Sequence, residues 1–515
     1  MQVSDPSTLS SQERPYFSAL WRGGRITTDG VENCQLGHRL DLGGRHGPDG
    51  IFVEWSWDGD ALTVRNDRYG IYPLFYACHA GEIRISPSIL HVLRGDFPKT
   101  LNVAALAVFL RLGFFLQEDT PFEHVHLLPP GSTLTWRQGK LTLRRGSMDV
   151  PVPETPVTSF DEAVEQYGQL FRQAISRRPP PASGFTLPIS GGRDSRHILF
   201  ELLEQGHKPD LTVTVQSRPP SSNEDLRIAR ILARELELVH EEIAMPRSYF
   251  QANLKDIEVT HFCGSGHTWL LPVAAYLKAN GTKTVYDGLA GDVLSGGLQA
   301  NENRLSLIKS GQTRNVAISL TQESGLTQFL QSSLKDTPRR ILDETLAVER
   351  IDNELKTHLG AANPWMSFIF WNRTRRGIGL IPFSILSPVE TVYCPYLDHE
   401  LFDFFWNLDP TYSMGNALHD ETIRRSYPQH AHLPFEDKHA PRATGAAESA
   451  FYRRGVAEFL AHYMSHPRRL RSRLVKSERI VAMLARDLMR MQCPSTWYLQ
   501  PSLYLMELEE QLDRL

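Results

Sequence analysis

Hydrophobic and polar positions divide the chain into a strand-rich first part and a second part in which strands and helices alternate. In the first part, short apolar or alternating runs separated by turns predict strands, because period-two patterning is typical of half-buried strands. These runs cover 51–55, 62–64, 72–78, 83–85, 133–136 and 140–143. Asp58-Gly59 and Ala80-Gly81 are hairpin turns between them. One helix is predicted over 103–112.

In the second part, helical and strand-like segments follow one another in turn. We expect helices over 160–176, 196–205, 223–236 and about 271–279, and strands over 186–189, 211–215, 239–243 and 284–287. This alternation predicts a parallel, doubly wound α/β sheet. From about residue 300 onward the pattern is mostly helical.

The stretch 150–158 holds three prolines and few residues suited to a core, which makes it the best linker candidate. At 515 residues the chain is too long for one ordinary core, so two or three domains are expected. We place the domains at 1–150 and 159–515.

Charge and cysteine content narrow the class of protein. A net charge of −4 and a pI near 6.6 give no electrostatic case for binding nucleic acid or an anionic membrane. The basic cluster 467–473 is interpreted as a solvated helix face. Five scattered cysteines without a C-x-x-C pair, no signal-peptide pattern, and a longest apolar stretch (103–116) interrupted by Arg111 predict a cytoplasmic protein.

The most informative segment is Leu187–Ser195, which includes Ser190-Gly191-Gly192-Arg193-Asp194-Ser195. An apolar strand stops at a glycine turn, and a helix begins directly afterwards. Unpaired backbone N–H groups at a helix start bind anions, and glycines let phosphate approach the chain closely. Asp194 would hold the magnesium that binds the phosphates. The segment is not a P-loop, because no Gly-Lys-Ser/Thr follows.

A second acidic loop follows the strand that ends at Asp287. Its sequence, Gly288-Leu289-Ala290-Gly291-Asp292, carries a carboxylate to the carboxyl edge of the parallel sheet, where open α/β folds bind ligands. Asp292 alone is as well explained as a turn residue. Together with Asp194, it predicts a shared magnesium ion bridging the phosphates of ATP.

A set of motifs in order resembles the asparagine synthetase superfamily. The segments are Asp67–Tyr76 (D-R-Y-G-I-Y-P-L-F-Y), Leu128–Gly131 (L-P-P-G), the loop 190–195, Asn223-Glu224, 288–297, and Pro395–Asp398 (P-Y-L-D). The resemblance implies a degenerate N-terminal Ntn-hydrolase-like αββα domain of the glutaminase (class II amidotransferase) type. It implies a C-terminal ATP-pyrophosphatase domain with a doubly wound parallel sheet and a helical C-terminal part.

The resemblance also implies the chemistry. A carboxylate attacks the α-phosphate of ATP, pyrophosphate leaves, and an amine displaces AMP from the acyl-adenylate to form an amide. ATP and Mg²⁺ are therefore the expected cofactors. The expected ATP and pyrophosphate contacts are Ser190, Gly191, Gly192, Arg193, Asp194, Ser195, Leu187, Val215 and Gly288, with Asp194 and Asp292 as metal ligands. Strand ends 187–190 and 212–215 would form the adenine pocket.

A cationic residue near the α-phosphate comes from 433–442 by this resemblance. Lys438 is the first choice, and counting from the preceding proline selects Arg442 instead. Either supplies positive charge, but only a lysine could donate a proton, because arginine stays charged. Arg196 is an unusual additional positive charge beside the loop. Its side chain is equally well interpreted as exposed on the surface or as a contact to phosphate.

At two positions this chain lacks a residue that the family uses in its chemistry. Glutamine-dependent members use an N-terminal cysteine, and this chain has Gln2 at that place, which is not a nucleophile. The position occupied by an acid in asparagine synthetases and by a tyrosine in β-lactam synthetase is Leu289 here. Candidates for the missing group are Tyr286, Asp287 and Glu390.

Three hypotheses remain. The first is an AMP-forming amide ligase of specialised metabolism that works without glutamine. Its amine comes either from the substrate itself, as in lactam synthetases and lasso-peptide macrocyclases, or from a second molecule. The second is an asparagine synthetase that uses free ammonia, and the third is an inactive nucleotide-binding relative. The expected partners are a carboxylate-bearing small molecule or peptide and an amine, with a homo-oligomer or a biosynthetic partner protein compatible with this class, and neither nucleic acid nor membrane.

Overall fold

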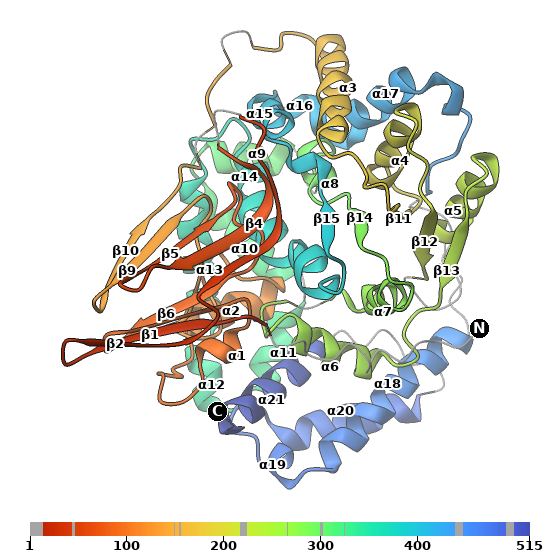
Figure 1. Ribbon diagram of the computed structural model, residues 1–515. Coiled ribbons are helices and arrows are strands. Elements are labelled where there is room, and N and C mark those ends of the chain that lie inside the picture. The colour runs from red at the N-terminus through yellow and green to blue at the C-terminus, as the bar shows by residue number, and fades with distance from the viewer. Residues whose placement is uncertain are drawn as a thin grey trace.

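The first domain is a sandwich of two antiparallel sheets (Figure 1). The computed structural model describes residues 14–43, 47–148, 150–153, 156–216, 224–264, 266–298, 302–323, 325–437, 446–490 and 499–514. One sheet has the order β2 (Arg25–Gly30), β1 (Phe17–Arg22), β7 (Glu82–Ser86), β6 (Phe75–His79), β8 (His126–Leu127). The other has the order β10 (Lys140–Arg144), β9 (Thr133–Arg137), β5 (Ala61–Asn66), β4 (Asp49–Trp57), β3 (Asn33–Leu40).

Aromatic side chains fill the space between these two sheets. Trp57 lies with its ring centroid 5.6 Å from that of Phe17 in the facing sheet and 6.2 Å from that of Trp136. Period-two alternation sends every second residue of β9 into this core, as the sequence predicts. The helices described within residues 14–148 are α1 (Ile89–Val92) and α2 (Val103–Leu112). The α2 helix begins at Asn102, whose side chain accepts the Ala105 N–H, and ends at a left-handed Gly113.

The predicted linker carries no helix or strand in its described residues and leads into α3 (Phe160–Ser176). This helix starts with a capping box, because Ser159 accepts the Glu162 N–H while the Glu162 carboxylate accepts the Thr158 N–H. The apolar face of α3 then packs against the second domain.

The second domain is built on a five-stranded sheet in which every pairing is parallel. Its order is β13 (His240–Ile243), β12 (Leu211–Val215), β11 (Thr186–Pro188), β14 (Thr284–Tyr286), β15 (Thr391–Tyr393). From β11, the strands that follow in the chain, β12 and β13, are added on one side. From β14, the next strand, β15, is added on the other side. The boundary between β11 and β14 is therefore the topological switch point, where ligands bind in open α/β sheets.

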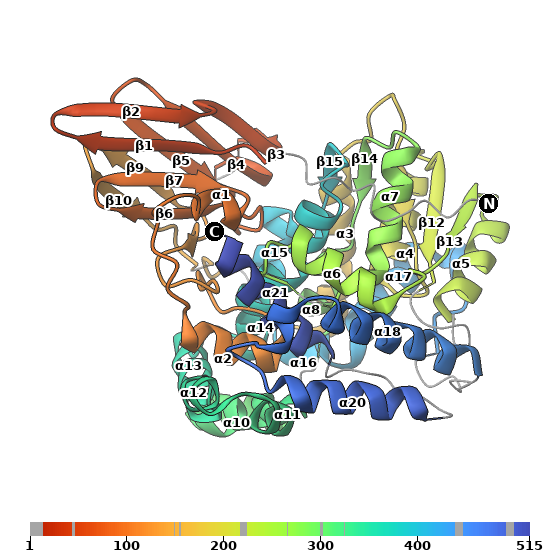
Figure 2. The ribbon, with the colours of Figure 1, turned by 90° about the horizontal axis from the view of Figure 1, so that it is seen from below.

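Helices lie on both faces of this sheet, as the alternating pattern predicts. In Figure 2, α7 (Leu271–Ala279) lies in front of the strands, with α3 and α4 (Asp194–Glu204) behind them. The α5 helix (Glu224–Glu235) packs on β12 and β13. The remaining strand, β15, follows a long helical insertion and was not anticipated from the sequence.

The rest of the chain is mostly helical, as predicted. The insertion between β14 and β15 contains α8 (Gly291–Leu294), α9 (Glu302–Lys309), α10 (Thr313–Glu323), α11 (Leu326–Ser333), α12 (Asp336–Ile341), α13 (Glu344–Thr357), α14 (Pro364–Ile369) and π-helical turns at Phe370–Ile378 and Ile381–Ile385. After β15 come α15 (His399–Asn407), α16 (Pro410–Ser413), α17 (Ala417–Ser426), α18 (Ala446–Met464), α19 (Pro467–Leu470), α20 (Ser477–Met489) and α21 (Leu499–Arg514). Between β13 and α7 lies α6 (Tyr249–Val259).

Arginines of the basic cluster 467–473 pair with acids of α21. Arg469 contacts Glu510 at 2.9 Å, and Arg473 contacts Glu509 and Asp513 at 3.0 and 2.6 Å. Much of the positive charge is thus compensated within the protein. Among the helices that the structure describes, none combines the length and apolar character needed to cross a membrane.

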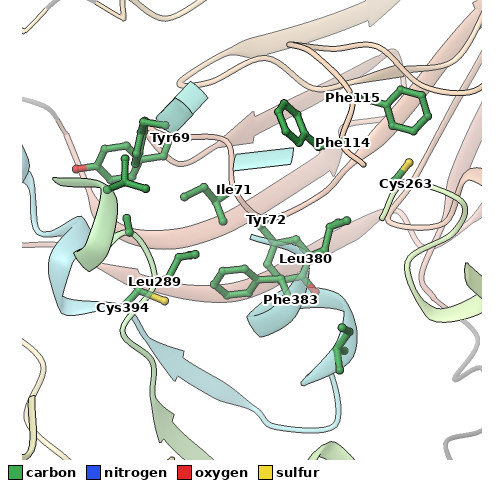
Figure 3. Close-up of a cluster of buried hydrophobic side chains, with 14 of the residues drawn as sticks. Tyr69, Ile71, Tyr72, Phe114, Phe115, Cys263, Leu289, Leu380, Phe383 and Cys394 are labelled. Atoms are coloured by element: carbon green, nitrogen blue, oxygen red, sulfur yellow. The ribbon is translucent and has the colours of Figure 1, made fainter. Parts of the chain in front are cut away.

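Apolar side chains of both domains form one buried cluster between them. Figure 3 shows Tyr69, Ile71 and Tyr72 of the first domain beside Leu289 and Phe383 of the second. The Tyr72 and Phe383 ring centroids are 5.4 Å apart. The segment Asp67–Gly70 therefore contributes to packing between the domains. From the sequence, it was used only as a sign of family membership.

Buried arginines of the second domain bind backbone carbonyls of the first. Arg375 donates to the carbonyls of Gly70 and Leu128 at 3.1 and 2.9 Å. Arg376 donates to the carbonyl of Asp119 at 2.7 Å. Burial lowers the pKa of Arg375 to about 9, so the guanidinium remains protonated at neutral pH. Because each carbonyl is fixed in its own turn, these contacts fix the relative position of the two domains.

An ion network also crosses the domain boundary. Arg178, at the end of α3, contacts Asp49 of β4 at 2.7 Å and Asp398 of the P-Y-L-D segment at 3.0 Å. All three side chains are nearly inaccessible. Asp398 also caps α15 by accepting the Glu400 N–H at 3.2 Å. This segment thus acts as a structural junction.

We predict that Arg178→Met destabilises the protein by about 3–5 kcal/mol, because it leaves the buried Asp49 carboxylate without its arginine and leaves the buried Asp398 with Arg177 alone. Arg137→Met, which removes a pair to Asp60 with side chains 66% and 43% exposed, should cost less than about 1 kcal/mol. Denaturant unfolding followed by circular dichroism measures both. Equal losses in the two variants would contradict the role assigned to Arg178.

His38 of β3 is a second buried polar group at the boundary. Its ring lies edge-on to that of Tyr393 in β15, with centroids 5.0 Å apart. Neither ring nitrogen has a hydrogen-bond partner in the described part of the chain. Burial, aided by the positive charge of Arg178, lowers the pKa of His38 to about 3, so the ring is neutral in the folded protein.

This burial makes the free energy of unfolding depend on pH. Below the unfolded histidine pKa of about 6.5, the unfolded chain binds a proton that the folded protein excludes, so stability falls as pH drops toward 3. At pH 5 His38 should account for about 2 kcal/mol of this loss. His38→Phe should therefore reduce the difference in unfolding free energy between pH 7.5 and pH 5 by about that amount. An unchanged difference would show that the ring is already charged or exposed.

Candidate active site

The predicted phosphate loop follows β11 directly and is closed by its own side chains. The Ser190 N–H donates to Ser195 Oγ at 3.1 Å, and the Gly192 N–H donates to Ser190 Oγ at 3.1 Å. The two hydroxyl oxygens lie 3.2 Å apart. The α4 helix begins at Asp194, two residues before the helical start that its sequence predicts. The strand–turn–helix prediction is confirmed.

Gly191 lies at the tightest point of the loop. Its N–H donates to the Asp225 carboxylate of α5 at 2.8 Å, and its carbonyl accepts the Glu436 N–H at 3.1 Å. A Cβ at this position would lie 2.8 Å from Glu436 Cβ, so only glycine fits. A phosphate that reaches the Gly191 N–H must displace the carboxylate of Asp225.

The second acidic loop packs directly on the first. A Cβ on Gly288 would lie 2.7 Å from Asp194 Cβ, and one on Gly291 would lie 2.5 Å from Asp194 Cγ. Ala290 turns the chain with a left-handed φ of 74°. The backbone N–H of Asp292 then donates to the Asp194 carboxylate. The structure therefore brings Asp194 and Asp292 together at the switch point.

Electrostatics at this point are unfavourable without a cation. Burial, and next the charge of Asp292, raise the pKa of Asp194 well above its usual range. Burial raises the pKa of Asp287, at the end of β14, to about 6. Crowded hard-oxygen ligands beside a phosphate-sized loop suit Mg²⁺, which commonly takes one or two carboxylates and completes its shell with phosphates and water. The described residues hold no cluster of three or more His, Cys, Asp or Glu that could bind a metal by themselves.

The two arginines beside the loop contact protein groups. Arg193 forms a bidentate pair with Asp420 of α17, with one contact of 2.9 Å. Arg196 is 1% exposed and donates to the carbonyls of Leu433 and Pro434 at 3.2 and 2.6 Å. Both guanidinium groups lie over the ring of Phe435, at 5.1 and 4.0 Å. Surface exposure is therefore the wrong interpretation for Arg196, because the side chain is buried and anchors the segment 433–437 to α4; phosphate contact stays a prediction.

The structure places the other site residues predicted from the sequence in several parts of the second domain. Val215 is at the carboxyl end of β12, and Leu187 is fully buried within β11. Tyr286 is also fully buried, and its hydroxyl donates to the carbonyl of Arg178. Glu390 precedes β15 at the opposite edge of the sheet and pairs with Lys283 at 3.3 Å. Lys438 and Arg442 lie outside the described residues.

Leu289 does not provide an open, polar position facing Asp194 and Asp292. It is 3% exposed and lies in the interdomain apolar cluster near Cys394 and Phe383 (Figure 3). Its N–H donates to the Asp287 carboxylate at 2.8 Å. The family resemblance indicates that Leu289 replaces an acidic residue. The structure adds that the leucine side chain is packed into the apolar cluster.

Sequence reasoning missed several groups at the site. Asp225 holds the loop amide, Asp420 holds Arg193, and His419 of α17 lies 3.6 Å from Asp194. Asp225 follows the Asn223-Glu224 motif by one residue, which was a usable signal. His419 and Asp420 have no local signal, because their partners are more than a hundred residues away in the chain.

Comparison with known proteins decides the family. Residues 46–145 match the family model of the glutamine amidotransferase domain, and residues 166–373 match that of asparagine synthase. The chain belongs to the asparagine synthetase superfamily. The first domain is the Ntn-hydrolase-like amidotransferase part, and the parallel sheet belongs to the asparagine synthase part.

Three curated relatives of this superfamily member are distant. Asparagine synthetase [glutamine-hydrolyzing] 2 of Bacillus subtilis is 25% identical over 75% of this chain and 54% of its own length. Amidase chyE of Penicillium rubens is 22% identical over 73% of this chain and 65% of its own length. Amidase chry2 of Gibberella zeae is 25% identical over 48% and 40%. The chain thus spans less than two thirds of the length of each of these relatives.

We predict that Arg196→Met releases the segment 433–437 from the phosphate loop. It removes two hydrogen bonds and a cation–π contact, so the Glu436 amide should exchange its hydrogen roughly tenfold faster or more. Hydrogen exchange with mass spectrometry measures this. Arg234→Met, on the exposed side of α5 and paired only with its neighbour Glu235 among the described ion pairs, is the control and should leave this amide unchanged. Unchanged exchange in Arg196→Met would contradict the anchoring role.

Proposed function

We propose that this protein is an ATP-dependent, AMP-forming amide ligase that activates a carboxylate and joins it to an amine. The observation that carries the proposal is the convergence of Asp194 and Asp292 from two adjacent strands at the switch point. Asparagine synthase homology supports it, and the names of the relatives, one asparagine synthetase and two amidases, agree with chemistry at amide bonds.

Adenylation accounts for the parts of the loop. A substrate carboxylate oxygen bonds to the α-phosphorus of ATP while the bond to the bridging oxygen breaks, and pyrophosphate leaves. The Gly192 N–H and the Ser190 and Ser195 hydroxyls now contact one another at the start of α4, and on leaving these contacts they would donate to phosphate oxygens. Asp194 and Asp292 would hold Mg²⁺, which would neutralise charge on the phosphates. An amine nitrogen then bonds to the acyl carbon, AMP leaves, and the nitrogen loses a proton.

Glutamine-independent operation is part of the proposal. Glutaminases of this class need a cysteine thiolate. Burial raises the pKa of every cysteine in the described part of the chain: Cys34 to about 11, Cys263 to about 12, and Cys78 and Cys394 in the same direction. None of these four thiols is activated. The first domain is then retained for packing, consistent with its buried contacts to Arg178 and Arg375.

An amine supplied by the substrate or a second molecule follows from the apolar surroundings of Leu289. A buried leucine can neither accept a proton nor bind ammonia, which argues against an ammonia-using asparagine synthetase. Intramolecular ring closure of the lactam-synthetase or macrocyclase type and joining to a second molecule both fit this proposal. An inactive nucleotide-binding relative is disfavoured, because both candidate metal ligands are present.

A pyrophosphate-release assay with ATP and Mg²⁺ over a panel of amino acids, amino-acid derivatives and linear peptides tests the proposal. We expect release with at least one carboxylate-bearing compound and AMP as the second product. Asp292→Asn should reduce the rate by more than about 100-fold through lost phosphate-charge stabilisation. Asp403→Asn, which alters a 2.5 Å pair to Arg68 away from the loop, should leave the rate within a few-fold.

Two results would overturn the proposal. One is ATP hydrolysis to ADP instead of AMP. The other is full activity in Asp292→Asn. Binding of ATP with no AMP from any compound in the panel would favour the inactive relative.

A further inference from the structure

His419 joins the two acidic loops to α17. Its Nδ1 lies 2.8 Å from Ser295 Oγ and 3.6 Å from Asp194 Oδ1. Its Nε2 lies 3.2 Å from His197 Nδ1 and 3.3 Å from the Tyr396 hydroxyl. The ring is 1% exposed. These partners belong to the segment after α8, to α4, and to the P-Y-L-D segment.

The hydrogen bonds around the ring select one tautomer. Ser295 Oγ also lies 2.7 Å from the carbonyl of Gly291, which can only accept. If Ser295 gives its single proton to that carbonyl, its oxygen accepts from His419, and Nδ1 carries the hydrogen. That N–H also faces the Asp194 carboxylate, whereas a lone pair there would be repelled. Nε2 then accepts from Tyr396 or from His197.

His419 is itself held by a buried set of rings. His197 stacks on Phe171 with ring centroids 3.7 Å apart, and its Nδ1 lies 3.3 Å from the Tyr167 hydroxyl. Tyr396 also reaches the carbonyl of Asp194 at 3.4 Å. Because α3, α4 and α17 all contribute, the ring cannot shift without moving the helix that carries Asp194.

We propose that His419 is a positioning residue for magnesium–ATP binding, acting through Asp194. The inference rests on the proposed function. Its Nδ1–H donates to Ser295 Oγ, three residues after Asp292, and its Nε2 lies against His197, three residues after Asp194, so the ring fixes the separation of the two candidate metal ligands. His419 does not touch ATP and exchanges no proton with it. Its partner Ser295, one turn after Gly291, fixes the tautomer that this role needs.

Two substitutions separate positioning from packing. His419→Asn keeps a donor at the place of Nδ1, and His419→Gln keeps one at the place of Nε2. We expect the affinity for α,β-methylene-ATP with Mg²⁺ to stay within about threefold of wild type in His419→Asn. In His419→Gln it should fall about 5- to 10-fold, the upper range for loss of a hydrogen bond between neutral groups. Isothermal titration calorimetry measures both, with His462→Asn on α18 as a remote control.

The same titrations with EDTA in place of Mg²⁺ provide the discriminating readout. If His419 acts through the metal ligand, the difference between the Asn and Gln variants disappears without Mg²⁺. A difference of the same size with and without Mg²⁺ indicates packing and overturns the proposal. Equal affinity of both variants and wild type with Mg²⁺ also overturns it.

Nitrogen-15 spectra of histidine-labelled protein test the tautomer directly. We expect a neutral ring protonated at Nδ1, assigned by its loss in His419→Asn. A ring protonated at Nε2 overturns the inference. Failure of wild type to bind magnesium–nucleotide would instead overturn the proposed function, so the two failures are distinguishable.

Discussion

The close approach of two loops between β11 and β14 is the constraint on which the rest of this structure depends. Gly288 and Gly291 leave no room for a side chain against Asp194, so a carboxylate from the first strand is forced beside the loop that carries Asp292. Packing buries this carboxylate and holds it beside Asp292; burial, and next the charge of Asp292, raise the pKa of Asp194. Under the proposed function, a cation and the phosphates it binds would relieve the repulsion between the two carboxylates.

The surrounding architecture keeps this arrangement rigid. Arg178 fixes β4 of the first domain to Asp398, while Arg375 and Arg376 hold turns of the first domain by their carbonyls. Arg193 and Arg196 fasten α17 and the segment 433–437 to the start of α4. The first domain and the basic residues near the loop thus serve mainly to position the acidic pair.

Local signals made part of this predictable. The bounds of α2 and α3 match their capping residues, and the apolar runs of β11 and β12 are unambiguous. The loop and both aspartates follow from strand–turn–helix order. By contrast, β15 has three residues and pairs only with a strand more than a hundred positions earlier, so its periodicity is too short to detect. Asp420 and His419 were missed because tertiary packing alone brings them to the loop, and the same packing buries Arg196 and Leu289.

The most direct test of the account is a crystal structure with α,β-methylene-ATP and Mn²⁺, using anomalous scattering to locate the metal. The account predicts a manganese peak bridging Asp194 and Asp292, with the phosphates against Ser190–Ser195 and the Asp225 carboxylate withdrawn from the Gly191 amide. Nucleotide bound elsewhere, or a metal held without either aspartate, would contradict it.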